Sequence, residues 1–214
     1  MILNMQSINK QFDSQTVLKD FSLKVEENEF LVILGKSGCG KSTLLNIIGL
    51  LDKPDSGEIT IFNQQNVKPF TKNANKLLRN KIGYLFQNFA LLEDKTVEEN
   101  MLLCLEHTPG NKEELIKDAL TQVGLFGYED KKIYKCSGGE QQRVALARLL
   151  IKPCELILAD EPTGSLDKDN KKIVLDLLAK LNQDGKTVIV VTHDEEVKKY
   201  AKRILYLDRE RKDI

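Results

Sequence analysis

Charge of one sign is what this sequence most clearly lacks. Its 32 Lys and Arg residues are balanced by 32 Asp and Glu residues, which leaves a formal net charge of zero. Proteins that bind nucleic acid usually carry a basic surplus, because contacts with the phosphate backbone supply much of their affinity. The balance therefore predicts no nucleic-acid partner.

Long apolar runs are also missing. The longest candidates, Leu31–Leu34 and Leu156–Ala159, have the length of buried strands, whereas a membrane-spanning helix needs roughly 20 apolar residues. Residues 1–6 show no basic region followed by an apolar core, so we expect no secretory signal.

Cysteine pairs are missing too. Without any C-x-x-C pair, neither a disulfide framework nor a metal cluster is expected, and a reducing compartment is the default. These observations predict a cytoplasmic chain; its four cysteines are Cys39, Cys104, Cys136 and Cys154.

Outside its middle, the chain alternates between short apolar segments and helical patterns. Such alternation predicts an α/β fold, with a mostly parallel sheet covered by helices on both faces. The expected strands are Ser22–Val25, Phe30–Leu34, Glu58–Phe62, Leu156–Ala159, Thr187–Val191 and Ile204–Leu207, and the later helices are Gln141–Leu150, Asn170–Leu181 and Glu195–Ala201.

The middle of the chain has a different character. From about Asn88 to Cys136 we find helical patterns, at Val97–Leu105 and Glu113–Val123, and no convincing strand. We therefore expect a single domain over residues 1–214, with a catalytic core at 1–87 and 137–214 and a helical subdomain inserted at about 88–136.

A phosphate-binding loop follows the strand at Phe30–Leu34. The pattern Gly35-x-x-x-x-Gly40-Lys41-Ser42 lies between a buried strand and a helix, which is the context this loop requires. Its glycines let backbone N–H groups turn toward an anion, and the next helix points its positive end at the same place. Lys41 is expected to reach the β- and γ-phosphates, and the Ser42 hydroxyl to ligate Mg²⁺. The predicted nucleotide-binding residues of the loop are Gly35, Lys36, Ser37, Gly38, Cys39, Gly40, Lys41, Ser42 and Thr43.

A second helix start also has features of an anion site. Ser137 and Glu140 have the spacing of a capping box, which by itself indicates only a well-capped helix. Gly138 and Gly139 fall in the first turn, where glycine is a poor helix former. Two glycines there are explained if a phosphate approaches the backbone closely, and helix physics alone leaves both interpretations open.

Two acids end the strand at Leu156–Ala159. Strand geometry brings Asp160 to the carboxyl edge of the sheet, where α/β proteins bind their ligands. A carboxylate there suits Mg²⁺. The neighbouring Glu161 is placed to polarise a water for attack on the γ-phosphate.

The stretch from Ser137 to Arg148 resembles the signature motif of ABC-type ATPases, and the resemblance extends over nearly the whole chain. It implies a P-loop NTPase fold of the ABC type with an N-terminal antiparallel β part. Cys136 replaces the usual leucine before the motif, while Lys36 and Cys39 replace the commoner proline and serine of the phosphate loop. None of these changes removes a glycine or the essential lysine.

The resemblance also assigns roles to residues that would mean little alone. It implies that Ser137, Gly138 and Gly139 contact the γ-phosphate bound by another subunit, and that Asp167 belongs to a loop coupling the two sites, Ser165–Asp167. His193 would hydrogen-bond the γ-phosphate, and Gln87 would join the metal and water site to the helical insertion. Phe12 would stack on adenine, although a core phenylalanine is an alternative. Near the phosphate, the Cys39 thiol is expected to be unusually reactive.

We therefore predict an ATP-hydrolysing subunit that binds ATP and Mg²⁺ and dimerises on ATP binding. Its partner would be a separate membrane permease, in the branch that includes lipoprotein-release, macrolide-export, bacteriocin-export and cell-division ATPases. The chain would then be peripheral on the inner face of the membrane. Two alternatives remain: an ATPase that regulates a membrane partner, and a soluble one acting on ribosomes or DNA. The apolar residues expected to meet the permease, with internal packing as the alternative, are Phe89, Leu91 and Leu92.

Overall fold

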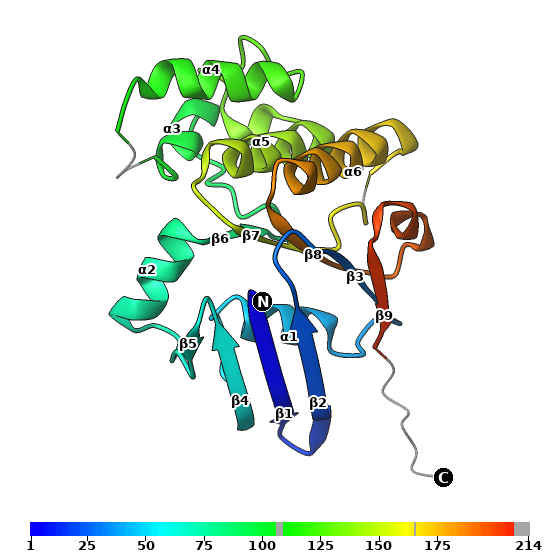
Figure 1. Cartoon of the computed structure of the whole chain (residues 1–214). Helices are drawn as coiled ribbons and strands as arrows, with labels where there is room; N and C mark the ends of the chain where they lie inside the picture. The colour runs from blue at the N-terminus through cyan, green and yellow to red at the C-terminus, as the bar shows by residue number, and fades with distance from the viewer. Residues whose placement is uncertain (106–108, 165, 208–214) are drawn as a thin grey trace.

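The computed structural model describes residues 1–105, 109–164 and 166–207, and these residues form two β-sheets with helices between and beside them (Figure 1). The first sheet is antiparallel, with strands in the order β2-β1-β4-β5. This sheet supplies the N-terminal antiparallel β part that the resemblance implied. Its strands are β1 (Leu3–Phe12), β2 (Gln15–Val25), β4 (Ser56–Ile61) and β5 (Gln64–Gln65).

The second sheet has the order β6-β7-β8-β3-β9, and every neighbouring pair in it is parallel. The prediction of a parallel sheet is therefore confirmed. All residues of β3, β7 and β8 are buried, as expected of apolar strands covered on both faces. The strands are β3 (Phe30–Leu34), β6 (Ile82–Leu85), β7 (Leu156–Asp160), β8 (Thr187–Thr192) and β9 (Arg203–Tyr206).

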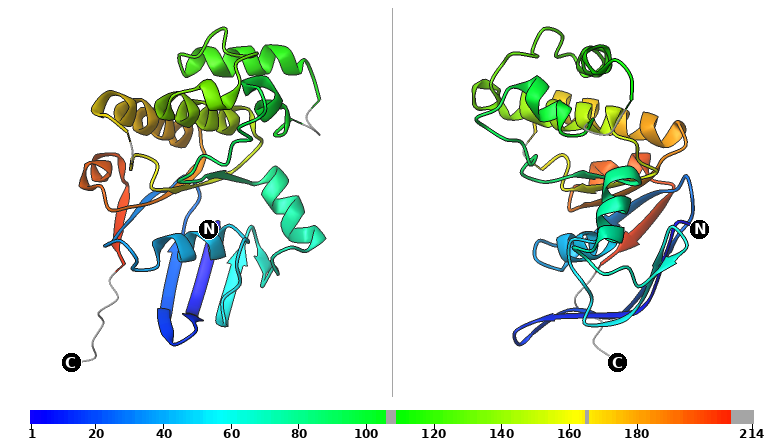
Figure 2. Two further views of the ribbon diagram at one scale, coloured as in Figure 1. Left: turned by 180° about the vertical axis from the view of Figure 1, so that it is seen from behind. Right: turned by 90° about the vertical axis from the view of Figure 1, so that its left-hand side faces the viewer.

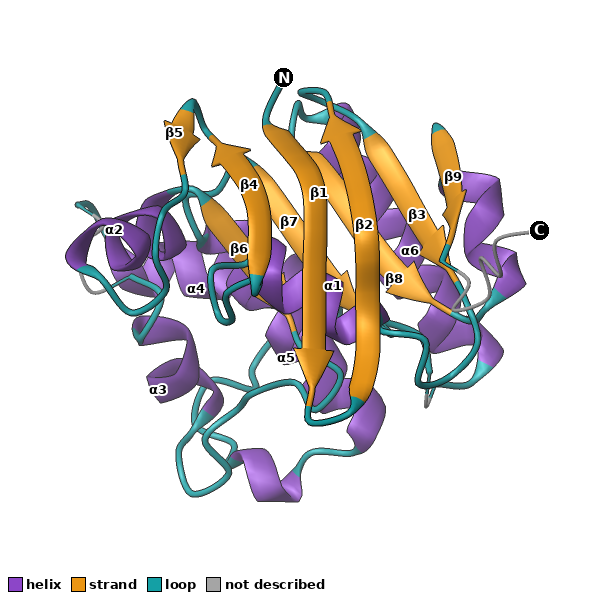
Figure 3. Ribbon diagram, turned by 90° about the horizontal axis from the view of Figure 1, so that it is seen from below, coloured by secondary structure: helices purple, strands orange, loops and turns teal. Residues whose placement is uncertain are grey.

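Side chains of the parallel sheet point alternately into two hydrophobic clusters. In β3, Phe30, Val32 and Leu34 join a cluster with α5 (Gly138–Ile151) and α6 (Lys168–Gln183). Leu31 and Ile33 join the other cluster, with α1 (Lys41–Ile48) and the antiparallel sheet. The result is four layers, in which α1 lies between the two sheets while α5 and α6 cover the opposite face (Figures 1 and 3).

The segment between β6 and α5 contains α3 (Val97–Leu102), α4 (Lys112–Gln122) and a short 3₁₀ helix at Ile133–Lys135. Its described residues contain no strand, and only one isolated bridge, between Thr96 and Lys132, pairs extended backbone there. α4 packs on α5, so these helices lie on the far side of the parallel sheet from the antiparallel sheet (Figure 2).

Several elements differ from the sequence prediction. β1 and most of β2 were not predicted, nor was α2 (Lys72–Asn80), where only Ala74 and Leu77 are buried. The segment predicted as a helix at Glu195–Ala201 is a 3₁₀ helix at Glu195–Tyr200. Within the described ranges, no helix combines the length and the apolar character needed to cross a bilayer.

Candidate functional site

The predicted site residues converge at the carboxyl ends of four adjacent parallel strands. The phosphate loop follows β3, Asp160 ends β7, Thr192 ends β8, and Gln87 lies two residues after β6. Parallel strands deliver their carboxyl ends to one edge of the sheet, which explains why segments so distant in sequence meet.

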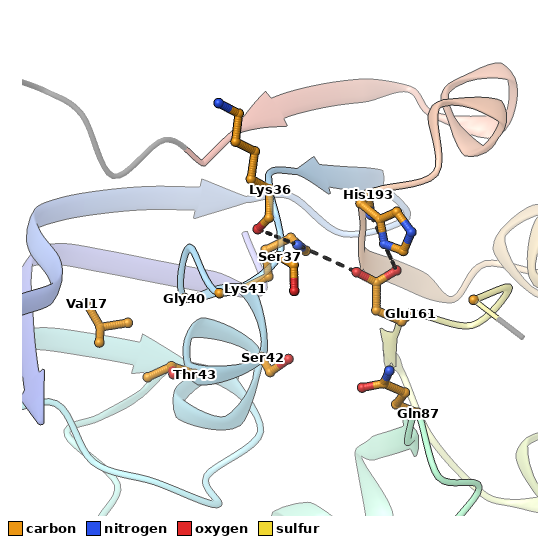
Figure 4. A pocket seen from close by; sticks show the side chains of 12 residues that line it. Val17, Lys36, Ser37, Gly40, Lys41, Ser42, Thr43, Gln87, Glu161 and His193 are labelled. Atoms are coloured by element: carbon orange, nitrogen blue, oxygen red, sulfur yellow. Dashed lines mark hydrogen bonds and ion pairs between the residues drawn. The ribbon is translucent and has the colours of Figure 1, made fainter.

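These segments enclose a pocket of about 460 Å³, which is within the usual size range of ligand sites. Figure 4 shows the Glu161 carboxylate between the His193 ring and the phosphate loop. Besides the predicted loop residues, the wall includes two residues that the sequence did not indicate, Val17 and Gly164. The full lining is Val17, Lys36, Ser37, Gly38, Gly40, Lys41, Ser42, Thr43, Gln87, Glu161, Gly164 and His193.

The start of α1 is shaped for an anion. Its N-cap is Gly40, whose φ of 104° is strained for any residue with a side chain, and a Cβ there would lie 2.6 Å from Val17 Cγ1. No side chain caps the first turn of α1. Its backbone N–H groups are therefore left for a bound ligand, at the positive end of the helix.

Lys41 is buried beneath the loop. Its Nζ donates hydrogen bonds to the carbonyl oxygens of Gly35, at 2.7 Å, and Lys36, at 3.1 Å, and lies 3.5 Å from Glu161 Oε1. The Lys41 ammonium group thus lies between the phosphate loop and Glu161, whose carboxylate balances its charge.

Glu161 is held by β8 as well as by Lys41. Its Oε2 accepts a hydrogen bond of 2.9 Å from Thr192 Oγ1 and one of 3.3 Å from the His193 N–H, and lies 3.0 Å from His193 Nδ1. The Glu161 backbone has a φ of 46°, in the left-handed region that non-glycine residues rarely adopt. A strained residue with this many contacts is a frequent feature of active sites.

Ser42, in the pocket wall, and Asp160, buried behind it, offer oxygen ligands that fit a magnesium ion. Ser42 Oγ donates to Asp160 Oδ1 at 3.1 Å, and Gln87 lines the same pocket. Hydroxyl, carboxylate and amide oxygens are the ligand types that Mg²⁺ prefers. Burial raises the pKa of Asp160, against the opposing effects of the Ser42 hydrogen bond and the Lys41 charge. An added cation would reverse that effect and favour the ionised form.

The start of α5 is separate from this pocket. Ser137 caps it, with its Oγ accepting from the Glu140 N–H at 3.3 Å and its own N–H donating to Glu140 Oε2 at 2.8 Å. Ser137 and Gly138 are exposed, and a Cβ built on Gly138 would meet nothing within 4 Å. None of Ser137, Gly138 and Gly139 lines the pocket.

Comparison with known proteins decides the family. Residues 18–164 match the family model described as ABC transporter. The chain belongs to the ABC transporter family. This confirms the family inferred from the Ser137–Arg148 motif. Membership of this family supports ATP binding, as does a solved relative described as an ATP-binding cassette bound to ADP and Pi.

Relatives of this ABC cassette support the predicted branch. It is 41% identical to the macrolide export ATP-binding/permease protein MacB of Campylobacter jejuni, covering 94% of this chain and 32% of MacB. The chain thus spans about a third of the length of that relative.

Two solved structures share the fold of this cassette. The dimeric structure of MJ0796, a bacterial ABC transporter cassette, has a TM-score of 0.88 at 39% identity, covering 96% of this chain and 94% of the other. A dimeric post-hydrolysis state of MJ0796 bound to ADP and Pi has a TM-score of 0.87 at 37% identity, covering 97% and 94%. The related MJ0796 sequence comes from Methanocaldococcus jannaschii.

Two residues assigned to nucleotide binding in this ABC cassette lie at its periphery. Phe12, at the end of β1, is 48% exposed and does not line the pocket, and Lys10 Nζ lies 4.8 Å from its ring centroid. The alternative of a core phenylalanine is therefore wrong, while adenine stacking stays a prediction. Asp167 caps α6, and its Oδ1 accepts from the Asn170 N–H at 2.9 Å. Ser165, beside it, lies outside the described residues.

The expected reactivity of Cys39 is not supported. The residue is 5% exposed, belongs to the hydrophobic cluster around α1, and has its Sγ packed against the Cα of Gly35 rather than in the pocket wall. Reactive thiols are normally accessible. The sulfur fills core space here, so Cys39 can serve the nucleotide only through its backbone.

One residue touching the predicted general base was not singled out from the sequence. Thr192 lies directly before His193, in a segment recognised only for its histidine, and donates to Glu161. The sequence did indicate Thr192, because a hydroxyl residue there ends an otherwise apolar strand, next to a candidate site residue.

Proposed function

We propose that this ABC cassette hydrolyses ATP between two copies of the chain and uses the cycle to drive a membrane permease. The substrate would be exported, and a peptide, a lipoprotein or a drug-like molecule fits the branch. The cassette would then be cytoplasmic and bound to the inner face of the membrane through the permease.

One observation carries this proposal: the phosphate site is divided between two separate surfaces of the chain. The pocket contains Lys41, Ser42, Glu161 and His193, whereas Ser137 and Gly138 are exposed elsewhere. A second copy related by a two-fold axis would bring its Ser137 turn to the first copy's pocket, and the reverse. ATP would supply contacts present only in the closed dimer, so it would shift the equilibrium toward that state.

The pocket residues fit in-line attack of water on the γ-phosphate. Lys41 now pairs with Glu161, and bound phosphates offer it stronger anionic partners. Glu161 would then be available to orient water and accept its proton, with Thr192 and His193 fixing the carboxylate. Mg²⁺ held by Ser42, Asp160 and Gln87 would neutralise phosphate charge. His193 would donate to the γ-phosphate as negative charge develops.

The permease surface would lie where the chain leaves β6. Leu92 is 47% exposed, whereas Phe89 and Leu91 are partly buried against the cluster beneath α3 to α6. The internal-packing alternative thus applies to Phe89 and Leu91, and Leu92 is left as the apolar contact. Arg148 of α5 donates to the carbonyl oxygens of Phe89 and Ala90, which have φ values of 64° and 47°. The name of MacB joins an ATP-binding part to a permease, which supports a permease partner here.

The test uses Glu161→Gln, which keeps the shape of the side chain and removes the base. Hydrolysis should fall at least about 100-fold, because orienting and deprotonating water contributes about that much. ATP binding should persist, so Mg-ATP should convert the variant into a dimer in size-exclusion chromatography with light scattering. Glu113→Gln on the exposed surface of α4 is the control and should hydrolyse ATP normally. A Glu161→Gln chain that stays monomeric in saturating Mg-ATP would refute the proposed sandwich, in which ATP is bound between two copies of the chain.

A further inference from the structure

A buried polar side chain on α5 lies directly behind the hydrolysis site. Gln142 is 2% exposed, and its Nε2 donates to the Pro162 carbonyl oxygen at 2.9 Å. Pro162 follows Glu161, the predicted general base. Because an unpaired buried polar group is costly, a glutamine at a core position needs such a partner.

The backbone that receives this hydrogen bond is one that needs support. Glu161 has a φ of 46°, and the residue before a proline is already disfavoured from helical conformations by the proline ring. Strained backbone persists only where its surroundings over-determine it. Here the Glu161 N–H donates to Val191 O at 2.9 Å, and Gln142 fixes the next carbonyl group.

The other end of the same loop is attached to α5 as well. Arg143 donates to the Asn170 side-chain oxygen, and Asn170 Nδ2 donates to Asp167 Oδ2 at 2.7 Å. Asn170 also packs against the first turn of α5, since a Cβ at Gly139 would lie 3.0 Å from its Nδ2. The segment from Glu161 to Asp167 is thus joined to one helix near both of its ends.

We infer that Gln142 is a positioning residue that makes the placement of Glu161 depend on contact at the start of α5 in the same chain. The inference rests on the proposed function. In the sandwich, the Ser137 turn of one copy touches the nucleotide of its twin, while Glu161 of that copy acts on its own nucleotide. Gln142 and Pro162 then join the two active sites by a path inside one chain, so occupancy of one site adjusts the base of the other.

If Gln142 and Pro162 connect the two active sites, ATP hydrolysis should be cooperative and the cooperativity should depend on Gln142. Gln142→Met keeps the length and the burial of the side chain but cannot donate to Pro162. We expect kcat to fall about tenfold, because small errors in the placement of a reacting group are costly. The Hill coefficient for ATP should drop from near its limit of about 2, set by two sites, toward 1. Gln142→Glu, a second isosteric change, should give the same result.

Gln141→Met is a matched control. Gln141 lies on the same helix and its Nε2 also donates to backbone carbonyl oxygens, those of Ile133 at 3.3 Å and Cys136 at 3.1 Å, away from Glu161. It should retain the kinetics of the parent chain within about twofold. Rates are measured over a range of ATP concentrations, together with thermal unfolding of each variant. A merely structural role for Gln142 would lower the unfolding temperature and kcat without changing the Hill coefficient.

Dimerisation separates this inference from the proposed function. In a Glu161→Gln background, Gln142→Met should still dimerise with Mg-ATP, since the Lys41 loop and Ser137 turn are intact. If the Glu161→Gln chain itself stays monomeric, the proposed function fails. If it dimerises but the parent chain shows no cooperativity, or Gln142→Met and Gln142→Glu retain the parental Hill coefficient, the inference is wrong while the sandwich stands. An equal loss in Gln141→Met would also overturn it.

Discussion

Two helices begin with glycine-rich segments, and their starts are built in opposite ways. α1 begins at Gly40 without any side-chain cap and faces a pocket of its own chain. α5 begins at Ser137 with a complete capping box, and its Gly138 faces open space. The first start leaves its N–H groups for a ligand held within the chain. The second is stable by itself and presents its first turn outward, as a surface for a site in another molecule should.

The charges beside the two starts differ as well. Lys41 opens α1, and its ammonium group is buried. α5 has an acid, Glu140, in its first turn, where it accepts from Tyr128 Oη at 2.7 Å and from Lys131 Nζ at 2.9 Å. A phosphate approaching α5 would therefore meet an acid already matched by local donors. The following three predictions test this contrast.

The largest effect is expected at α1. Lys41→Met removes the cation that we propose faces the phosphates and should lower kcat/KM for ATP at least about 100-fold, or about 3 kcal/mol of transition-state stabilisation. Lys36→Met is the control, because Lys36 is exposed in the same loop. Its backbone carbonyl oxygen accepts from Lys41, and this contact does not depend on the Lys36 side-chain charge. Steady-state hydrolysis measures both. Equal losses in the two variants would show that the effect of Lys41 is not specific.

An intermediate effect is expected at α5. Gly138→Asp should leave the monomer as stable as the parent, because the site is open and an acid in the first turn favours the helix. In a Glu161→Gln background it should weaken ATP-driven dimerisation about thirtyfold, since charge repulsion from a phosphate costs roughly 2 kcal/mol. Light scattering across a protein dilution series measures the change. Gly138→Ala, without the charge, should weaken it less. An unaltered dimer in Gly138→Asp would contradict phosphate contact there.

The smallest effect concerns the cap of α5. Burial opposes ionisation of Glu140, but hydrogen bonds from Tyr128, Lys131 and the Ser137 N–H outweigh it and lower its pKa from 4.5 to about 2. Because the pKa is lower in the folded state, the stabilisation is complete above about pH 4.5 and is lost as the pH falls toward 2. Glu140→Gln should therefore lower the free energy of unfolding at pH 7 by about 1–2 kcal/mol.

The pH dependence is the sharper part of that test. Urea unfolding at a series of pH values should show the difference between Glu140→Gln and the parent shrinking below about pH 4.5. Glu113→Gln should differ from the parent by less than about 0.5 kcal/mol throughout. If the difference in unfolding free energy between Glu140→Gln and the parent stays constant with pH, the carboxylate charge does not stabilise the cap.

Elements with uninterrupted patterns could be predicted from the sequence, and irregular ones could not. The apolar runs at β3, β7 and β8 were found because both faces of each strand are buried. β1 and β2 were mostly missed because their pairing contains register shifts, between Met5 and Ile8 among others, and Ser7 and Asp20 have positive φ. Each irregularity resets the period of two, so the alternation of apolar residues fades.

The site follows the same division. Lys41, Ser42, Asp160, Glu161, Gln87 and His193 were proposed from motifs, and the structure brings them to one edge of the sheet. Gln142 and Thr192 were not singled out, because their significance depends on the partners that the fold brings near them. A buried glutamine in a helix rich in Gln and Arg looks like surface until its carbonyl partner is known.

α5 reaches the three places on which the proposed function depends. Its first turn is exposed at Ser137, and Gln142 donates to the Pro162 carbonyl oxygen, next to Glu161. Near the end of α5, Arg148 donates to the carbonyl oxygens of Phe89 and Ala90. With 14 residues it is about 21 Å long. As a stiff lever of that length, it would convert a tilt of about 5° at one end into a displacement of about 2 Å at the other. Under the proposed function, a small tilt of α5 at the Ser137 end would therefore shift the Phe89–Ala90 backbone at its other end, where the permease would bind.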